Sequence, residues 1–162
     1  SDPIDSGTPM VAYSDPDNSN ALLISSAAEI STTNNAANIS INTDDIEVST
    51  GQISVNNSSV VNIGQFTNAV TIDLGGADVL GTTLGITDAE LDKITGATIN
   101  IGNTNSGGIT VSSAITHAAG NINLVTGSGL LIKATLGAGT GNININAAGG
   151  IYPDFSGVDL SG

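Results

Sequence analysis

Aliphatic and polar residues alternate along much of this chain. In the first half, one aliphatic series recurs every seven residues: Ile39, Ile46, Ile53 and Val60. In a second series, each residue lies two positions C-terminal to a residue of the first: Ile41, Val48 and Val55. Alternation with a period of two is typical of a β-strand that buries one face. The pattern therefore predicts a series of short strands connected by turns.

In the second half of the chain the pattern repeats every 21 residues. An Asn-Ile pair recurs at this spacing: Asn100-Ile101, Asn121-Ile122 and Asn142-Ile143. A glycine that precedes an aliphatic residue recurs in the same phase: Gly108, Gly129 and Gly150. Successive aliphatic positions lie six to eight residues apart within each unit. Each 21-residue unit thus predicts three short strands.

This repeat predicts an all-β fold, a right-handed parallel β-helix over residues 21–162 with three short strands in each coil. Every coil would bury its inward aliphatic side chains against its neighbours, and successive strands would pair in parallel. The recurrent glycines are expected at corners that need a positive φ. Asn123 and Asn144 fall on equivalent outward positions, so we expect their amides to form a hydrogen-bonded ladder.

Two segments depart from this rhythm. Thr87-Asp88-Ala89-Glu90 matches a helix capping box, which predicts a helical insertion over about residues 82–96 that projects from one corner and ends at Gly96. This insertion is expected to be a loop decoration or a contact with a neighbouring subunit. Residues 1–20 contain three prolines and lack strand alternation, which predicts a linker or an N-terminal cap.

The composition excludes several classes of protein. The chain has 15 acidic residues against two lysines, a net charge of −13, and no cysteine. Binding of nucleic acid or of anionic membranes needs clustered basic residues, so neither is expected. Disulfides and thiolate metal sites are impossible, and no apolar run approaches the roughly 20 residues that cross a bilayer. Insertion into a membrane is not expected either.

The sequence predicts no catalytic residues and no enzymatic activity. The single histidine, His117, lies at a predicted turn, where we expect it to be exposed. Polysaccharide lyases and pectin hydrolases share the β-helix architecture, but fold alone does not establish function. Lys93 and Lys133 are too far apart in the repeat to neutralise an acidic sugar. Asp44, Asp45 and Glu47 could supply a carboxylate pair, although neighbouring outward acids are usually a solvated face.

The sequence predicts no cofactor, and bound calcium is the weaker alternative. Asp73 and Asp78 flank a Gly-rich stretch that faintly resembles the nonapeptide of calcium-binding β-rolls. That motif normally occurs in tandem, whereas here it occurs once and without the expected glycine spacing. Asp44, Asp45 and Glu47 form a second cluster of oxygen ligands. We therefore predict no cofactor, with these five acids as the calcium candidates.

The repeats resemble a known family. Gly108-Ile109-Thr110-Val111, residues 119–124 and residues 141–145 are similar to the repeats of large filamentous-haemagglutinin-type exoproteins. The resemblance covers residues 97–151 closely and 36–75 loosely, and its weight comes from the 21-residue phasing. It implies a secreted bacterial β-helical fibre at the cell surface, used in adhesion, biofilm or surface contact. The Asn-Pro-rich secretion signature of that family does not occur in this sequence.

Three functions follow as expectations. The first is a non-catalytic structural shaft segment of a secreted cell-surface adhesin or exoprotein. The second is a self-assembling subunit of an extracellular filament, sheath or surface layer. The third is a carbohydrate-binding or carbohydrate-degrading β-helix, which the scarcity of aromatic residues disfavours. The expected partners are neighbouring repeats of a longer chain, other copies of this chain, and ligands on a host or biofilm surface.

Overall fold

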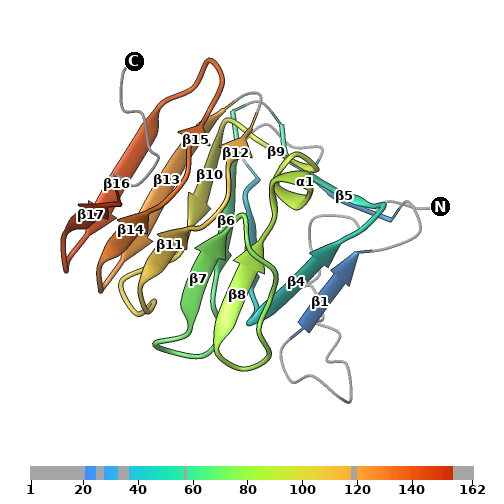
Figure 1. The fold of residues 1–162 in the computed structure, drawn as a ribbon. Helices are drawn as coiled ribbons and strands as arrows, with labels where there is room; N and C mark the ends of the chain where they lie inside the picture. Colours follow the sequence, from blue (N-terminus) through green and yellow to red (C-terminus); the bar gives the residue numbers. More distant parts are fainter. Residues whose placement is uncertain (1–20, 25–27, 33–36, 57, 118–119, 155–162) are drawn as a thin grey trace.

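The computed structural model describes residues 21–24, 28–32, 37–56, 58–117 and 120–154. The predicted linker or cap, residues 1–20, lies outside the described residues, as does residue 158, which continues the aliphatic series. The described part is all-β with one short helix, and every pairing between named strands is parallel (Figure 1). The predicted all-β class is confirmed.

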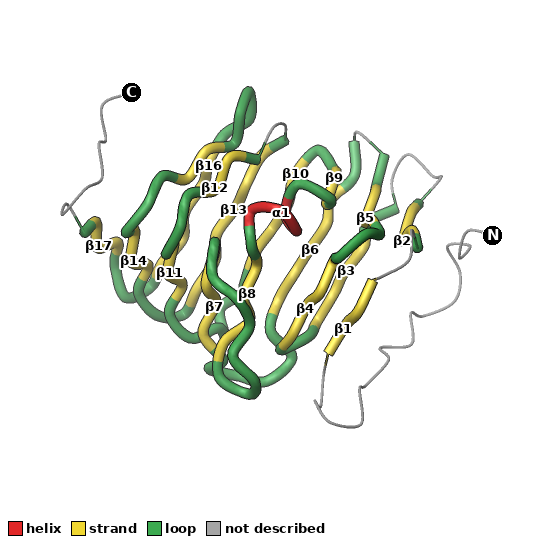
Figure 2. The backbone as a smooth tube through the Cα atoms, turned by 45° about the vertical axis from the view of Figure 1, so that its right-hand side comes forward, coloured by secondary structure: helices red, strands yellow, loops and turns green. Residues whose placement is uncertain are grey.

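Two five-stranded sheets contain most of the strands. Sheet 1 has the order β16 (Ile143–Ala147), β13 (Asn121–Thr126), β10 (Thr98–Ile101), β6 (Val60–Gly64), β3 (Ile39–Asn42). Sheet 2 has the order β17 (Ile151–Pro153), β14 (Leu130–Ile132), β11 (Ile109–Val111), β7 (Thr71–Leu74), β8 (Thr83–Ile86). Their strands lie side by side in rows that follow the order of the chain, except that β8 lies on the far side of β7 (Figure 2).

Three small sheets complete the arrangement. They are β1 (Ala21–Ile24) with β4 (Asp45–Val48), β2 (Glu29–Ser31) with β5 (Gln52–Ser54) and β9 (Ile94–Thr95), and β12 (Ile115–Thr116) with β15 (Leu136–Gly137). Along the chain, consecutive strands mostly belong to different sheets. The chain then adds a strand beside an earlier strand of the same sheet. We call the path from a strand to its next neighbour in the same sheet a circuit.

Strand pairing confirms the 21-residue period in the C-terminal part of the chain. Ile122 pairs with Ile143, and Leu130 pairs with Ile151. In the preceding circuit the period holds for Ile109 with Leu130 and for Ile115 with Leu136. It fails in sheet 1, because Asn100 pairs with Asn123 and not with Asn121. The path from β10 to β13 thus takes 23 residues. Ile99 and Ile101 both face inward because side chains alternate along the strand. A shift of the pairing register by two residues therefore keeps the same face buried, and the sequence does not reveal it.

The predicted insertion contributes a strand and a helix turn. The circuit from β6 to β10 takes 38 residues, since Val60 pairs with Thr98. The extra residues include β8, which pairs with β7, and α1 (Asp88–Leu91). The capping box is confirmed, although the helix ends at Leu91 rather than at Gly96. Leu84, Ile86 and Leu91 are fully buried, so this segment belongs to the core and does not merely project from a corner.

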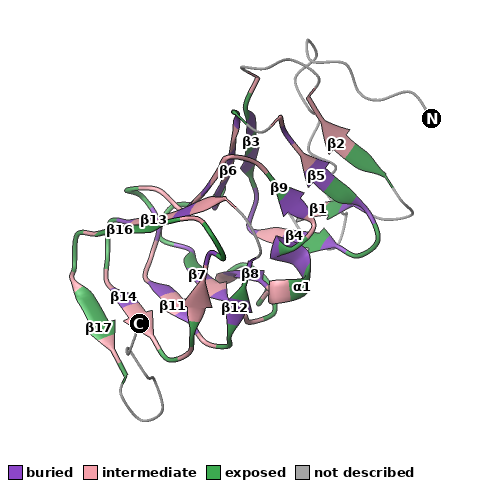
Figure 3. Cartoon of the chain, turned by 90° about the horizontal axis from the view of Figure 1, so that it is seen from above, coloured by how far each residue is buried: buried purple, intermediate pink, exposed green. Residues whose placement is uncertain are grey.

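The core consists of aliphatic side chains that the strands bury between the sheets. The buried parts of the strands are purple in Figure 3. The predicted inward residues of the first half are buried: Ile39, Ile41, Ile46, Val48, Ile53 and Val55. Val60 is an exception, because Val61 and Ile63 are the buried residues of β6. Val60 and Val61 are both aliphatic, and the alternation alone does not say which of them faces inward.

The predicted amide ladder is confirmed and is longer than predicted. On sheet 1, the side-chain amide of Asn144 donates to Oδ1 of Asn123 over 2.8 Å. Asn123 donates to Asn100 and Asn100 donates to Asn62, each over 2.7 Å. Asn62 completes the ladder by donating to Oγ of Ser40 over 3.1 Å. One row of side chains therefore connects all five strands of sheet 1.

The recurrent glycines have different roles. Gly150 has a φ of 98°, as predicted for a corner. Gly108 and Gly129 are not among the described glycines with positive φ, so the prediction is wrong for them. At Gly129, a Cβ atom would lie 3.0 Å from Cε2 of Tyr152. This glycine makes room for an aromatic ring on the adjacent strand.

Candidate functional site: the acidic junction of β4, β8 and α1

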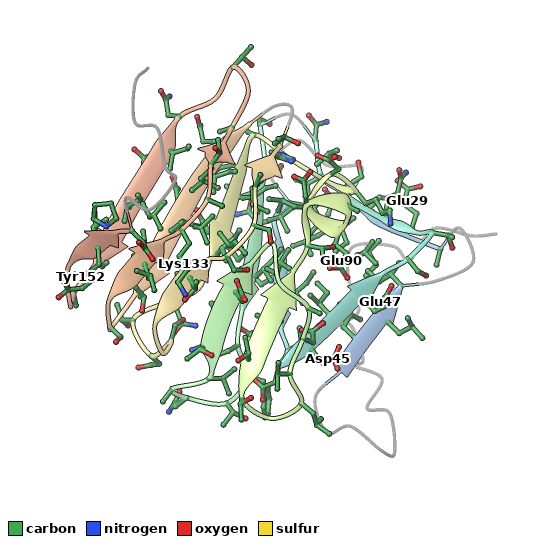
Figure 4. All side chains as sticks on the ribbon, in the orientation of Figure 1. Glu29, Asp45, Glu47, Glu90, Lys133 and Tyr152 are labelled. Carbon is green, nitrogen blue, oxygen red and sulfur yellow. The ribbon has the colours of Figure 1, made fainter. Side chains whose placement is uncertain are left out.

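Ionisable side chains from three elements converge at one place on the surface. Glu47 comes from β4, Asp78 from the loop before β8, Glu90 from α1, and Lys93 follows α1. They line an open hollow of about 320 Å³. Glu47 and Glu90 lie on neighbouring elements in Figure 4. We call this region the acidic junction.

Glu90 connects α1 to β4. The carboxylate is 8% exposed, and its Oε1 accepts a hydrogen bond from the backbone N–H of Val48 over 3.2 Å. Oε2 accepts from the backbone N–H of Thr87 over 2.9 Å and from its hydroxyl over 2.7 Å. The capping box therefore explains why the side chain of Glu90 points back toward the start of the helix. Hydrogen bonds to an ionised acceptor are among the stronger ones in proteins.

Lys93 makes a second connection between the same two elements. Its Nζ donates to the carbonyl oxygens of Val48 and Ser49, each over 2.6 Å. These carbonyls belong to the end of β4 and to the residue that follows it. The ammonium group thus stabilises the position where β4 ends, beside the carboxylate of Glu90.

The pKa of Asp78 departs clearly from the ordinary value of an aspartate. Removal from water raises the pKa of Asp78 to about 7. The hydrogen bond from the backbone N–H of Gly85, 2.7 Å long, opposes this rise, and the carboxylates of Asp45 and Glu90 add to it. Asp78 therefore exchanges its proton near neutral pH.

The junction contains groups that general acid–base chemistry uses. A carboxyl group that titrates near pH 7, beside a fixed carboxylate and an ammonium, is a recognised feature of active sites. However, Glu90 uses both of its oxygens to hold α1 against β4, and Lys93 donates to two carbonyls at the end of β4. The hydrogen-bonding groups of Glu90 and Lys93 are thus engaged in connecting elements of the fold.

The calcium candidates occupy different surroundings. Asp44 is buried, and its Oδ1 accepts from the backbone N–H groups of Phe66 and Thr67 over 2.8 and 2.9 Å. The expected solvated face is therefore wrong for Asp44. Asp45 is half-buried and Glu47 is exposed on β4, while Asp73 is half-buried on β7.

These acids are not assembled into a recognisable metal site. The described residues contain no group of three or more His, Cys, Asp or Glu side chains placed to hold a metal ion. The charge of Asp45 contributes to the raised pKa of Asp78, which connects the two clusters that the sequence suggested. Calcium binding by these acids stays an untested prediction.

His117 is buried, and the expected exposure is wrong. Its side chain is 4% exposed, and neither ring nitrogen has a hydrogen-bond partner. Nδ1 lies 3.9 Å from Oδ1 of Asp92. The signal was present in the sequence, since Ile115 of β12 faces inward and period-two alternation places residue 117 on the same side.

The C-terminal end of the stack is a second candidate site. Ile143 on β16 and Ile151 on β17 pair with Ile122 and Leu130, which are fully buried. Ile143 and Ile151 are nevertheless exposed, because the structure describes no strand beyond them. Figure 3 shows β17 as exposed at this end. Apolar surface at an open strand edge is typical of a contact surface.

Comparisons with family models, curated proteins and solved structures returned no match. The fold and both candidate sites are therefore interpreted from the geometry of this chain. Within the described residues, no helix has the length and apolar character needed to cross a membrane.

Proposed function

We propose that this chain is a right-handed parallel β-helix and that it forms a non-catalytic structural segment of the shaft of a secreted cell-surface adhesin or exoprotein. The observation that carries the proposal is the register between circuits. Residues at the same position of successive circuits pair in parallel, as in Leu130 with Ile109 on one side and Ile151 on the other. Such stacking is how solenoid proteins build an elongated core.

The side-chain rows support a structural role. The amide ladder of sheet 1 connects five successive strands from Ser40 to Asn144. The aliphatic rows lie behind it in the core. Because each circuit contacts mainly the circuits beside it, the ladder and the aliphatic rows add stability with every circuit. A long shaft needs this kind of uniform lateral connection.

The chemistry of the acidic junction also favours structure over catalysis. Its buried carboxylate, Glu90, and its ammonium, Lys93, connect α1 to β4. This connection holds the longest circuit, which includes β8, in the core. The non-catalytic role is therefore part of the proposal.

The extracellular location rests on composition and on resemblance. The chain is acidic and lacks cysteine, and residues 97–151 resemble the repeats of filamentous-haemagglutinin-type exoproteins. A high net charge keeps a repetitive protein soluble. Copies of the repeat in a longer chain and surface ligands of a host or biofilm are the partners that this role implies.

An antiserum against the 162-residue chain tests the proposed location. Intact cells that produce the protein should bind the antiserum, and mild protease treatment of these cells should remove the signal. An antiserum against a cytoplasmic protein serves as the control for cell integrity. Labelling that requires cell lysis would contradict a surface shaft.

A further inference from the structure

The outward face of sheet 1 is formed by strands without charge. The five strands β3, β6, β10, β13 and β16 contain no Asp, Glu, Lys or Arg, although the chain has a net charge of −13. Sheet 2 contains Asp73 on β7, and the small sheets contain Glu29, Asp45 and Glu47. The lack of charge is therefore a local property of sheet 1 in a strongly acidic protein.

The outward side chains of sheet 1 form polar rows across the strands, which lie side by side in Figure 2. The amide ladder is one of these rows. In a second row beside it, Asn142 donates to Asn121 over 3.3 Å, and Asn121 donates to Thr98 over 3.4 Å. The side chains of both rows are half-buried or exposed. The face thus presents two parallel rows of hydrogen-bonding groups to solvent.

The ladder leaves hydrogen-bonding capacity at each interior position. A side-chain amide has two N–H groups, and its oxygen can accept two hydrogen bonds. Asn100 donates one N–H to Asn62 and accepts one hydrogen bond from Asn123. A second N–H and a second acceptor position of the same amide remain for a ligand. Such donor and acceptor pairs recur at the strand spacing of about 4.8 Å.

The ladder also fixes its side chains before any ligand binds. Asn123, for example, is held between Asn100 and Asn144 by hydrogen bonds of 2.7 and 2.8 Å. A side chain that is already immobile loses little rotamer freedom on binding, which removes one cost of association. Contacts that repeat along a polymer strengthen one another, because they form within a single complex. A repetitive ligand can therefore bind this face without aromatic residues.

A neutral polysaccharide matches this face better than a charged polymer or a second copy of the chain. Sugar hydroxyls both donate and accept hydrogen bonds, as the remaining positions of the amides require. An anionic polymer would be repelled by the acids of the other sheets, and a cationic polymer would find no carboxylate on these strands. A second copy would bring another net charge of −13 to the contact. The straight rows favour an extended β-1,4-linked chain, whose sugar units are similar in length to the strand spacing.

We propose that the outward face of sheet 1 binds an extended, neutral, β-1,4-linked polysaccharide through its two rows of polar side chains. The sugar chain lies along the rows and crosses the strands, with about one sugar unit for each strand. This inference rests on the proposed function, because it names the class of surface ligand that the shaft would contact.

Cosedimentation of the full 162-residue chain with microcrystalline cellulose tests the proposal. Val125→Asp places a carboxylate at an outward position of β13, two residues from Asn123. Leu131→Asp is the matched control, since Leu131 is a half-buried aliphatic residue at an outward position of β14 in sheet 2. We expect Leu131→Asp to bind within about twofold of the wild type. Val125→Asp should bind about tenfold more weakly, because its carboxylate would lose water in the contact.

Two further measurements support this comparison. Asn146→Asp replaces Val125→Asp if the latter loses the far-ultraviolet circular dichroism of the wild type, because Asn146 is exposed and pairs with Val125. Cellulose whose primary hydroxyls are oxidised to carboxylates should bind the wild type more weakly than untreated cellulose does. Equal binding to the two forms would contradict a face that selects a neutral partner.

A wild type that does not sediment with cellulose would overturn the proposal, and so would equal losses of binding in Val125→Asp and Leu131→Asp. Pelleting of the wild type without cellulose, abolished by Val125→Asp, would assign the face to a second copy instead. Arrested growth of ice crystals without binding to cellulose would assign the face to a lattice of water. Each of these results removes the polysaccharide alone, since the surface labelling above tests the shaft independently.

Discussion

Asn144 donates its side-chain amide to Oδ1 of Asn123 over 2.8 Å, across the parallel pair of strands β16 and β13. The two residues are 21 positions apart and occupy the same place in successive circuits. Asn123 also donates to Asn100 over 2.7 Å, so it is an interior member of the ladder. Asn123 is therefore the position where the contribution of the ladder is most directly measured.

We predict that Asn123→Ala lowers the free energy of unfolding by about 1–3 kcal/mol, because it removes two hydrogen bonds and leaves two amides without their partner. Urea unfolding followed by circular dichroism measures the change. Asn146→Ala is the matched control: Asn146 is exposed on β16, and its substitution should cost less than about 0.5 kcal/mol. Equal effects of the two substitutions would contradict a stabilising ladder.

The aliphatic rows give a second matched pair. Ile122→Ala should lower the free energy of unfolding by about 2–5 kcal/mol, since Ile122 is fully buried and its truncation leaves a cavity. Ile143 is the same residue in the same register one circuit later, but it is exposed. Ile143→Ala should therefore cost much less in the monomer. If Ile143→Ala were as costly as Ile122→Ala at low protein concentration, the C-terminal end could not be open.

At the acidic junction, Glu90→Ala should destabilise the fold by about 1–3 kcal/mol. The substitution leaves the backbone N–H of Val48 without its buried acceptor and removes half of the capping box. Hydrogen exchange should show the loss first at α1 and the end of β4. Glu47→Ala changes an exposed acid on the same strand and should have little effect. A Glu90→Ala variant as stable as the wild type would show that the connection between α1 and β4 does not stabilise the fold.

The raised pKa of Asp78 predicts a specific dependence on pH. An aspartate with a pKa of about 7 in the folded state, above its value in the unfolded chain, stabilises the fold at low pH. This contribution is lost as pH rises through about 7. Asp78→Asn keeps an oxygen for the N–H of Gly85 but does not titrate. The thermal midpoint of the wild type should therefore fall more steeply than that of Asp78→Asn between about pH 4 and about pH 7.

Glu47→Gln controls for the general effect of removing one acid. Its midpoint should follow the wild type over the same pH range, because Glu47 is exposed. Parallel curves for the wild type and Asp78→Asn would rule out a titration of Asp78 near neutral pH.

Local patterns in the sequence were sufficient to predict the alternating strands other than β8, the capping box at Thr87 and the stacking of Asn123 on Asn144. Each of these depends on residues whose spacing directly determines their geometry. The number of residues in each circuit could not be predicted as well from the sequence. A strand that slides by two residues keeps its buried face, so the pairing of Asn100 with Asn123 was indistinguishable from a pairing with Asn121.

The acidic junction and the burial of Asp44 depend on contacts between distant segments. Glu90 reaches Val48 across 42 positions, and Asp44 reaches Phe66 across 22. The extra strand β8 was missed because the capping box led to a helical interpretation of the whole segment, although Leu84 and Ile86 show the period-two spacing of a strand. Only the stacking of circuits brings these residues together, and nothing in the local sequence reports it.

The measurement that tests the stacked parallel β-helix most directly is the length of a chain with added circuits. Three further copies of residues 122–142, inserted after Asn142, preserve the phase of the aliphatic row and of the amide ladder. Because adjacent strands lie about 4.8 Å apart, small-angle scattering of the monomer should show a particle longer by about 14 Å at an unchanged cross-section. A scrambled insertion of the same composition is the control. An extended variant whose cross-section grows, or whose added residues are digested by protease while the rest of the chain stays intact, would contradict the β-helix.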